Sequence, residues 1–346
     1  MINDKIFVSV LMSAYSEPIP MLKEAIDSIL NQTHSNLEFF IYLDKPNNEE
    51  LWRFLQDQAA KDSRLIVHKN EHNRLLAGTL NDELKDAKGD YIIRMDGDDI
   101  SVPYRIEHLI DFMEAHPEVG VASSWMREFG NRSRIHNHVV KYDVDFEKMK
   151  VNYLCFTPIA HAPCIIRRKV IEEFGPALYN ERCCKTQDYE LWSRLINAGV
   201  VFGMVSEPLY LRRASHGDGP SPINYRVIHN QVCRRNVQEV LKKIGLTLPD
   251  MIDKQLADNI RPHIKESSGL LKNQLKMIQC VIYSNVYSKP AKRLWSMLKK
   301  GDLGCLSVLT LRMKIRFIRP LVLTELDNMV KTPSDLIYTD NVLCQH

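Results

Sequence analysis

The first hundred residues alternate between two hydrophobic periods, and this alternation limits the possible folds more than any other feature. Short runs that are apolar almost throughout, as in buried parallel strands, are followed by segments with apolar residues every three or four positions, as on a helix face. The expected strands are 6–12, 37–43, 65–68 and 91–95, and the expected helices between them are 21–30, 49–61 and 75–87. This order with short connections predicts an α/β fold with a doubly wound, mostly parallel sheet and flanking helices.

Two helix boundaries carry local signals of their own. Gly89 follows the third expected helix and is interpreted as its C-terminal stop. Ser101 is interpreted as the N-cap of a fourth helix, with Pro103 in its first turn.

Polar residues follow three of the expected strands at the point where each strand ends. These residues are Ser13 to Glu17, Asp44, and Asp96 to Asp99. In doubly wound sheets, ligands bind outside the carboxyl ends of the strands. The sequence therefore predicts a functional site at this edge of the sheet.

The sequence Asp96-Gly97-Asp98-Asp99 directly follows an apolar strand. Carboxylates one residue apart at a strand end can share a hard divalent cation, which prefers oxygen ligands and substrate phosphates. A calcium loop beginning at Asp96 is excluded because Ser101 would stand where that loop requires glycine, and Pro103 would lie inside it. A solvated acidic turn with a capping role remains the alternative to a metal site.

The chain changes character after about residue 222. The first part, 1–222, carries the α/β pattern, whereas 223–346 reads as a helical C-terminal extension with few strand signals. Residues 289–319 hold nine Lys or Arg and one acid, together with many large apolar side chains. Such a segment is typical of an interfacial helix on an anionic membrane, although a helical subdomain packed on the core would show the same pattern.

Composition excludes several classes of protein. Apolar residues make up 45% of the 346 residues and charged residues 26%, so the chain is neither disordered, collagen-like nor a coiled coil. The net charge of +3 does not favour a nucleic-acid partner. The eight cysteines contain no Cys-x-x-Cys pair, which favours reduced thiols in a cytoplasm. Neither a secretory signal nor a spanning apolar run is expected, so a cytoplasmic protein, with peripheral binding to the inner membrane face, is predicted.

Several short motifs, in their order along the chain, resemble those of the family 2 glycosyltransferases of the GT-A fold. They are Val8 to Tyr15, Asp44, the pair Asn73 and Asn81, the acidic turn 96–99, the strand His161 to Arg168, and the helix start Gln187 to Leu195. The resemblance covers about residues 6–222 and is to inverting enzymes of the bacterial surface-polysaccharide type. It implies a GT-A sheet, a nucleotide-sugar donor and a Mn²⁺ or Mg²⁺ cofactor.

The resemblance also implies roles for the residues of the donor pocket. Ala14, Tyr15 and Glu17 would line the base and ribose pocket, and Asp44 would accept a hydrogen bond from a uracil or thymine base. The family's usual Asp-Asp-Gly-Ser stands here as Leu43-Asp44-Lys45-Pro46, so only one of its two acids remains. Asp96 would reach the ribose or the metal, and Asp98 would bind the metal directly.

Asp44 could instead cap the helix after the second strand. For Asn73 and Asn81, capping and packing are the alternatives to contact with the donor.

On the acceptor side, the resemblance implies that Asp188 is the general base that deprotonates the acceptor hydroxyl. The family's acidic neighbour is replaced by Gln187. His216 would complete the metal site or touch the diphosphate, and Arg212 or Arg213 would neutralise phosphate charge. His161 would contact substrate. The alternatives are a helix cap for Asp188, a solvated loop residue for His216 and a packing role for His161.

The predicted function is therefore an inverting hexosyl- or N-acetylhexosaminyl-transferase that uses a nucleoside-diphosphate donor, expected to be UDP-linked. The acceptor would be a hydroxyl on a growing surface glycan or a lipid-linked oligosaccharide. A sugar-phosphate nucleotidyltransferase is a weaker alternative, because the turn 13–18 lacks the glycine-rich basic loop that would hold phosphates. A non-catalytic, membrane-associated scaffold is the third interpretation, and donor hydrolysis with and without Mn²⁺ distinguishes it from the first.

Overall fold

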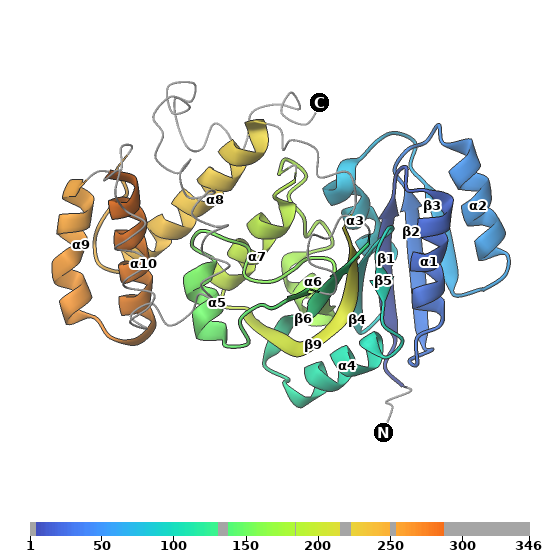
Figure 1. Cartoon of the computed structure of the whole chain (residues 1–346), viewed down its shortest axis with the longest axis horizontal. Helices are drawn as coiled ribbons and strands as arrows, with labels where there is room; N and C mark the ends of the chain where they lie inside the picture. Colours follow the sequence, from blue (N-terminus) through green and yellow to red (C-terminus); the bar gives the residue numbers. More distant parts are fainter. Residues whose placement is uncertain (1–4, 131–137, 184, 215–222, 250–253, 287–346) are drawn as a thin grey trace. The chain divides into compact units, whose positions relative to one another are not determined.

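A computed structural model describes residues 5–130, 138–183, 185–214, 223–249 and 254–286 (Figure 1). The chain divides into two compact units. The first comprises residues 1–144, 159–191 and 200–220, and the second comprises 145–158, 192–199 and 221–346. The second unit therefore includes two short pieces that lie within the stretch 1–222.

The first unit contains the sheet and the helices that flank it. Its strands are β1 (Val8–Ala14), β2 (Leu37–Leu43), β3 (Leu65–Lys69), β4 (Tyr91–Asp96), β5 (Ile100–Ser101), β6 (Val119–Phe129), β7 (Val139–Val140), β8 (Ile165–Arg167) and β9 (Val201–Arg213). Its helices are α1 (Ile19–Leu30), α2 (Glu49–Ala59), α3 (Leu75–Asp86), α4 (Arg105–Ala115), α6 (Arg168–Phe174) and the first turn of α7 (Gln187–Asn197).

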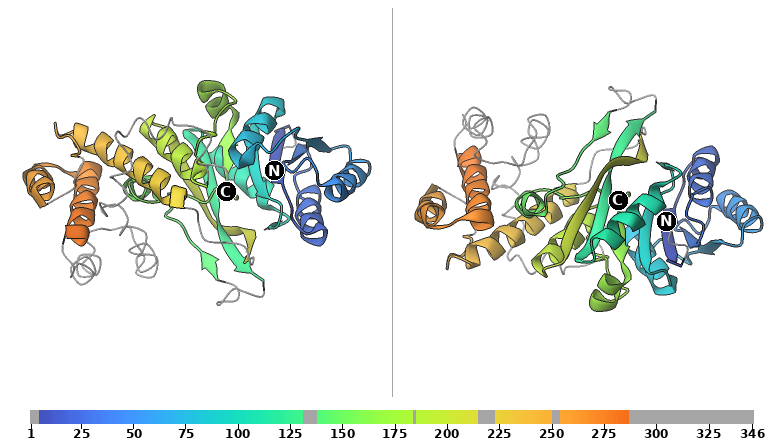
Figure 2. Two further views of the ribbon diagram at one scale, coloured as in Figure 1. Left: turned by 90° about the horizontal axis from the view of Figure 1, so that it is seen from above. Right: turned by 90° about the horizontal axis from the view of Figure 1, so that it is seen from below.

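In the described residues the strands form one mixed sheet in the order β3-β2-β1-β4-β8-β6-β9-β5, with β7 paired to β6. The first four strands are parallel, as the alternation of strands and helices predicts. Beyond β4, strand β8 runs antiparallel to both β4 and β6. The long strands β6 and β9 run parallel and side by side, as both views of Figure 2 show.

The core lies between the parallel strands and their helices. Every residue of β2 is buried, and β1 is buried at six of its seven positions, because helices cover parallel strands on both faces. Helix α1 buries Leu22, Ala25, Ile26 and Ile29, which recur at the spacing of one helix face. The predicted strands and helices of the first hundred residues are present, with ends that differ by a few residues.

The two predicted helix boundaries are wrong. Ser101 lies in the short strand β5, paired with Tyr210 of β9, and α4 begins four residues later at Arg105. Pairing with a strand more than a hundred residues away overrides the local capping signal. Helix α3 ends at Asp86, before Gly89, whose role is close packing: a Cβ at Gly89 would lie 2.3 Å from the amide nitrogen of Ser9.

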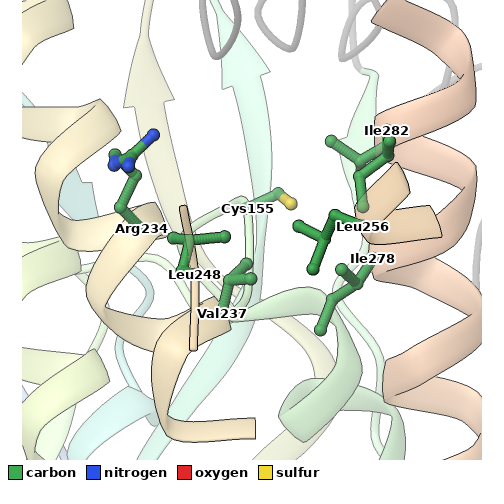
Figure 3. A pocket seen from close by; sticks show the side chains of 8 residues that line it. Cys155, Arg234, Val237, Leu248, Leu256, Ile278 and Ile282 are labelled. Atoms are coloured by element: carbon green, nitrogen blue, oxygen red, sulfur yellow. The ribbon is translucent and has the colours of Figure 1, made fainter. Parts of the chain in front are cut away.

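The second unit is helical in its described residues. It contains α5 (Phe146–Asn152), the rest of α7, α8 (Ile223–Lys242), α9 (Lys254–Glu266) and α10 (Gly269–Val286). A small pocket lies among α8, α9 and α10, with walls that include Cys155, Val237, Leu256 and Ile282 (Figure 3). The walls are apolar because most of the lining side chains are aliphatic. The guanidinium of Arg234, which also lines the pocket, donates a hydrogen bond from Nη2 to the Pro249 carbonyl at 2.8 Å.

Within the described part of the chain, none of the helices is both long enough and apolar enough to cross a bilayer. The basic segment 289–319 lies outside the described residues, so its predicted role at a membrane stays a prediction.

Candidate active site

The structure brings the three predicted strand ends together. Strand β1 lies between β2 and β4, with Ala14 beside Leu43 and Ser13 beside Asp96. The Asp44 amide donates a hydrogen bond to the Ala14 carbonyl at 2.7 Å. The carboxyl ends of β1, β2 and β4 therefore form one edge, which carries Asp44 and the acidic turn 96–99.

Asp44 is buried, and the segment that follows β3 holds its side chain in place. Its Oδ1 accepts hydrogen bonds from the Asn70 amide side chain at 2.8 Å and from the Arg74 backbone at 2.6 Å. Asp44 does not cap α2, because Asn48 does so by accepting a bond from the Leu51 amide.

Next to this carboxylate, Tyr15 leaves its ring exposed. The Lys45 ammonium lies 5.3 Å from the centre of that ring. The edge thus presents an aromatic face beside a fixed carboxylate, which suits a nucleobase.

Three carboxylates of this edge lie close enough to repel one another. Glu17 is fixed by a hydrogen bond from the Tyr15 amide to its Oε2 at 2.8 Å. A Cβ at Gly97 would lie 3.3 Å from Glu17 Cγ, so glycine allows Glu17 to approach the turn. Burial, with the charges of Asp98 and Asp96 added, raises the pKa of Glu17. Burial and the Asp96 charge likewise raise the pKa of Asp98.

The third acid of the turn, Asp99, holds the turn to β9. Asp99 Oδ1 accepts a hydrogen bond from the Arg213 backbone at 2.7 Å, and Arg213 Nε donates to the Asp98 carbonyl at 2.7 Å. The Tyr210 hydroxyl accepts a bond from the Asp96 amide and donates one to Asp99. Burial, with the charges of Asp96 and Asp98, raises the pKa of Asp99 to about 7.

Arg94 is the main residue of the site that the sequence analysis missed. It lies in β4, is buried, and forms an ion pair from Nη2 to Oδ1 of Asp96. The charge of Arg94 also lowers the pKa of Asp188 against the effect of burial. The available signal was a lone arginine inside the otherwise apolar run 91–95, where an unpaired charge would be costly.

Asp188 lies at the start of α7, and burial raises its pKa. The next contributions to its pKa come from the Tyr189 amide and Arg94, which lower it, while the charge of Asp96 raises it. Asp188 and Asp96 therefore feel each other's charge, although they are far apart in the sequence. A partly buried carboxylate with a raised pKa, close to an acidic strand edge, has the properties expected of a general base.

Two asparagines of the predicted site make structural contacts. The Asn73 side chain accepts a hydrogen bond from the Leu75 amide at 2.8 Å, at the start of α3. Asn81 pairs with the backbone of Tyr179 in both directions, at 2.8 and 2.9 Å, and also donates to Glu181. Asn81 thus fixes the segment that leads to Asp188.

His161 also supports this segment. It is buried, and its Nε2 lies 2.9 Å from the Tyr179 hydroxyl. Burial, with a contribution from the positive charge of Arg94, lowers the pKa of His161 well below its ordinary value, so the ring is neutral.

The two remaining predicted residues lie toward the end of β9 or beyond it. Arg212 is paired with Glu128 at 3.3 Å, whereas the neighbouring Arg213 is the one that contacts the acidic turn. His216 lies outside the described residues. Among the residues that the structure describes, no three His, Cys, Asp or Glu side chains gather as a metal site.

The doubly wound sheet, with paired acids beyond β4, a fixed acid beyond β2 and a partly buried carboxylate at α7, has the architecture of the GT-A fold. The predicted fold class is confirmed by solved structures. The chain resembles the mannosyltransferase of Pyrobaculum calidifontis in complex with GDP-Man and Mn²⁺, with a TM-score of 0.51, 16% identity and coverage of 91% of this chain and 85% of that one. It also resembles residues 1–349 of S. aureus TarS in complex with UDP-GlcNAc, with a TM-score of 0.52, 13% identity and coverage of 80% and 86%.

Sequence comparison identifies the family, which is glycosyl transferase family 2, matched over residues 9–175. An uncharacterized glycosyltransferase of Methanocaldococcus jannaschii is 31% identical over 62% of this chain and 73% of its own length. The putative glycosyltransferase EpsE of Bacillus subtilis is 30% identical over 66% and 82%. The chain belongs to glycosyl transferase family 2 and is an enzyme of the glycosyltransferase class.

A further relative is 28% identical over 56% of this chain and 71% of its own length. It is the Escherichia coli enzyme WfaP, a UDP-Glc:alpha-D-GlcNAc-diphosphoundecaprenol beta-1,3-glucosyltransferase.

Proposed function

We propose that this protein transfers a hexosyl or N-acetylhexosaminyl group, with inversion, from a UDP-linked donor to an acceptor hydroxyl on a surface glycan or lipid-linked oligosaccharide. The observation that carries the proposal is the convergence of Asp44, the acidic turn 96–99 and the partly buried Asp188 at one region of the first unit. The WfaP relative, which acts on a diphosphoundecaprenol-linked sugar, supports the donor and acceptor classes.

The donor side of the mechanism follows from the edge of the sheet. Asp44 accepts a hydrogen bond from the nucleobase of the donor. The Tyr15 ring covers this nucleobase, and the small side chain of Ala14 leaves room for it. Asp44 Oδ1 is already occupied by two donors, so Oδ2 is the oxygen that takes the base. Asp96 is held by Arg94 through Oδ1, which leaves Oδ2 for the ribose.

The residues present fit a divalent cation. Asp98 and Asp96 are hard oxygen ligands, and their mutual repulsion with Glu17 is the electrostatic stress that a cation relieves. Asp98 would hold Mn²⁺ or Mg²⁺, which would stabilise the charge that develops on the departing diphosphate. His216 and Arg212 stay proposed partners of the metal and the phosphates.

On the acceptor side, Asp188 accepts the proton of the acceptor hydroxyl. The hydroxyl oxygen forms a bond to the anomeric carbon on the face opposite the diphosphate, and the bond from that carbon to the diphosphate oxygen breaks. A positioned carboxylate supplies about 10²–10⁴ in rate. His161 and Asn81 act through Tyr179, which they hold next to this region.

The proposed function is tested by a donor screen. UDP-glucose, UDP-galactose, their N-acetylamino forms, GDP-mannose and dTDP-sugars are each incubated with the protein, and released nucleotide is measured with Mn²⁺, with Mg²⁺ and with excess chelator. We expect release from a UDP-sugar that depends on the metal. Absence of release from every donor, or full activity in chelator, would contradict the proposal.

Two variants then assign the roles. Asp188→Asn is expected to lose about 10²–10⁴ in turnover while the affinity for UDP stays within about twofold, because the amide cannot take a proton. Asp98→Ala is expected to lose the response to metal. Asp57→Asn, an exposed residue of α2, is the matched control and should behave as wild type.

A further inference from the structure

The link between β3 and α3, residues 70–74, holds Asp44 by one of its two carboxylate oxygens. The Asn70 side chain donates a hydrogen bond from Nδ2 to Asp44 Oδ1 at 2.8 Å, and the Arg74 amide donates to the same oxygen at 2.6 Å. Asp44 is 4% exposed, and its Oδ2 has no hydrogen-bond partner among the described residues but reaches the surface. The two bonds therefore leave Oδ2 to accept from a ligand at the strand edge.

The Asn70 side chain is itself anchored on two sides. Its backbone amide donates to the Leu43 carbonyl at 3.0 Å, so Asn70 is fixed to the residue that precedes Asp44. Its Nδ2 also donates to Thr79 Oγ1 at 3.1 Å, and Thr79 lies in α3 with no exposed surface. The amide group thus spends one hydrogen on Thr79 and one on Asp44, which fixes its plane. Asn70 is therefore a rigid donor aimed at Asp44.

The contact with Asp44 is not needed to hold the link in place. The Leu43 carbonyl secures its first residue, and at its end the Asn73 side chain accepts a hydrogen bond from the Leu75 amide at 2.8 Å. Leu75 has a φ of 58°, a left-handed conformation that is costly for leucine and persists where surrounding contacts impose it. The donors on Oδ1 are therefore best explained by what they do for Asp44, because a buried carboxylate needs donors to hold its charge and its orientation.

We propose that Asn70 is a positioning residue for nucleobase selection, which turns Asp44 so that Oδ2 accepts the ring N–H of uracil. The inference rests on the proposed function, in which Asp44 binds the base. Uracil carries a hydrogen on N3, whereas cytosine has a lone pair there. A fixed carboxylate oxygen therefore attracts the first base and repels the second. Asn70 acts through Asp44 and makes no contact with the donor itself.

The ratio of the affinities for UDP and CDP measures this selection. The two nucleotides share the ribose and the diphosphate, so the metal, the phosphate contacts and the overall stability of the fold affect both affinities alike. Each nucleotide is titrated by calorimetry into the full chain with Mn²⁺ present. We expect wild type to prefer UDP by about 10- to 100-fold, the worth of a hydrogen bond to a charged group. Asp44→Asn is the reference for loss of this preference.

Three further variants separate positioning from packing. Asn70→Ala removes the side-chain donor and is expected to lower the UDP-to-CDP ratio about tenfold. Thr79→Val keeps the shape but removes the acceptor that orients Asn70, and is expected to lower the ratio about threefold. Asn36→Ala is the matched control: Asn36 is likewise half-buried, but it lies before β2 and donates to the Ile6 carbonyl at 3.0 Å. It is expected to lower the thermal midpoint and to leave the ratio unchanged.

A folded Asn70→Ala whose ratio stays within about twofold of wild type overturns the inference. A wild type that binds both nucleotides equally or binds neither, or an Asp44→Asn that keeps the preference, overturns it as well, because Asp44 would then make no base contact to be positioned. If Asn70→Ala does not fold, an unchanged ratio in Thr79→Val overturns it. The donor screen is independent of this binding test: release from no donor refutes the proposed function even where the UDP preference and its dependence on Asn70 are found.

Discussion

Glu83 provides a test of the electrostatics beneath the donor edge. It lies in α3 with no exposed surface, its Oε1 accepts a hydrogen bond from the Tyr42 amide at 3.3 Å, and its Oε2 has no partner. Burial raises the pKa of Glu83 well above the ordinary value of 4.5; Arg94 opposes this shift and Asp44 adds to it. The folded state therefore keeps a proton that the unfolded state releases.

The sign of the effect on stability follows from this difference. Below about pH 4.5, Glu83 is protonated in both states and its contribution to the free energy of unfolding is fully present. As the pH rises toward the pKa of the folded state, wild type loses about 1.4 kcal/mol of stability per pH unit from this group alone. Glu83→Gln cannot ionise, so it does not suffer this loss.

Thermal unfolding of Glu83→Gln and wild type from about pH 5 to about pH 8 measures the effect. We expect the thermal unfolding midpoint of the variant to rise relative to that of wild type by about 3 °C per pH unit, until the pH reaches the pKa of Glu83 in the folded state. A constant offset between the two is also expected, because the buried amide leaves donors unsatisfied at about 1–3 kcal/mol. The slope with pH is therefore the measurement.

Glu49→Gln is the control with the opposite sign. Glu49 is exposed, and its hydrogen bond and ion pair with Lys69 lower its pKa, so its contribution is present above the unfolded pKa and is lost as the pH falls. A difference between Glu83→Gln and wild type that does not change with pH would refute the account of Glu83.

The remaining predictions concern the proposed general base Asp188, the packing of β1 against Gly89, and the basic segment 289–319. Because burial raises the pKa of Asp188, kcat/KM should fall on acidification at a pH above the ordinary Asp value of 3.8; a pH profile with its acid limb at that ordinary value would contradict this. Gly89→Ala should lower stability by about 1–3 kcal/mol in urea unfolding, because its Cβ would lie 2.3 Å from the Ser9 amide; an unchanged unfolding midpoint would show that β1 can move. Residues 289–319 should bind anionic but not neutral vesicles in co-sedimentation, with loss at high salt and on truncation near Ser288; sedimentation with neither kind would leave the tail without this role.

Much of the donor edge could be predicted from the sequence, because local patterns determine it. The apolar runs fix β1, β2 and β4, and strand ends of a parallel sheet meet at one edge whatever the loops do. The positions of Asp44 and of the acidic turn follow from this rule. Asp188 came from the resemblance to a family, since an isolated acid at a helix start carries no signal of its own.

Contacts between distant segments were decided by the tertiary structure alone. Ser101 is a good helix cap by its type and neighbours, yet pairing with Tyr210 places it in a strand. Asn81 and Tyr179 bond each other across 98 residues of chain, and no periodicity encodes such a pair. Of the two neighbouring arginines that the sequence offers, the structure places Arg213 on the acidic turn and pairs Arg212 with Glu128.

Arg94 shows the physical reason for this division. The sequence determines that an arginine stands within an apolar strand, because the strand is defined by its own neighbours. Whether that charge is tolerated depends on what the sheet places around it, here Asp96 two residues along the strand and Asp188 on another element. Secondary structure depends on nearest neighbours, whereas the electrostatics of a buried group sums over every element packed against it.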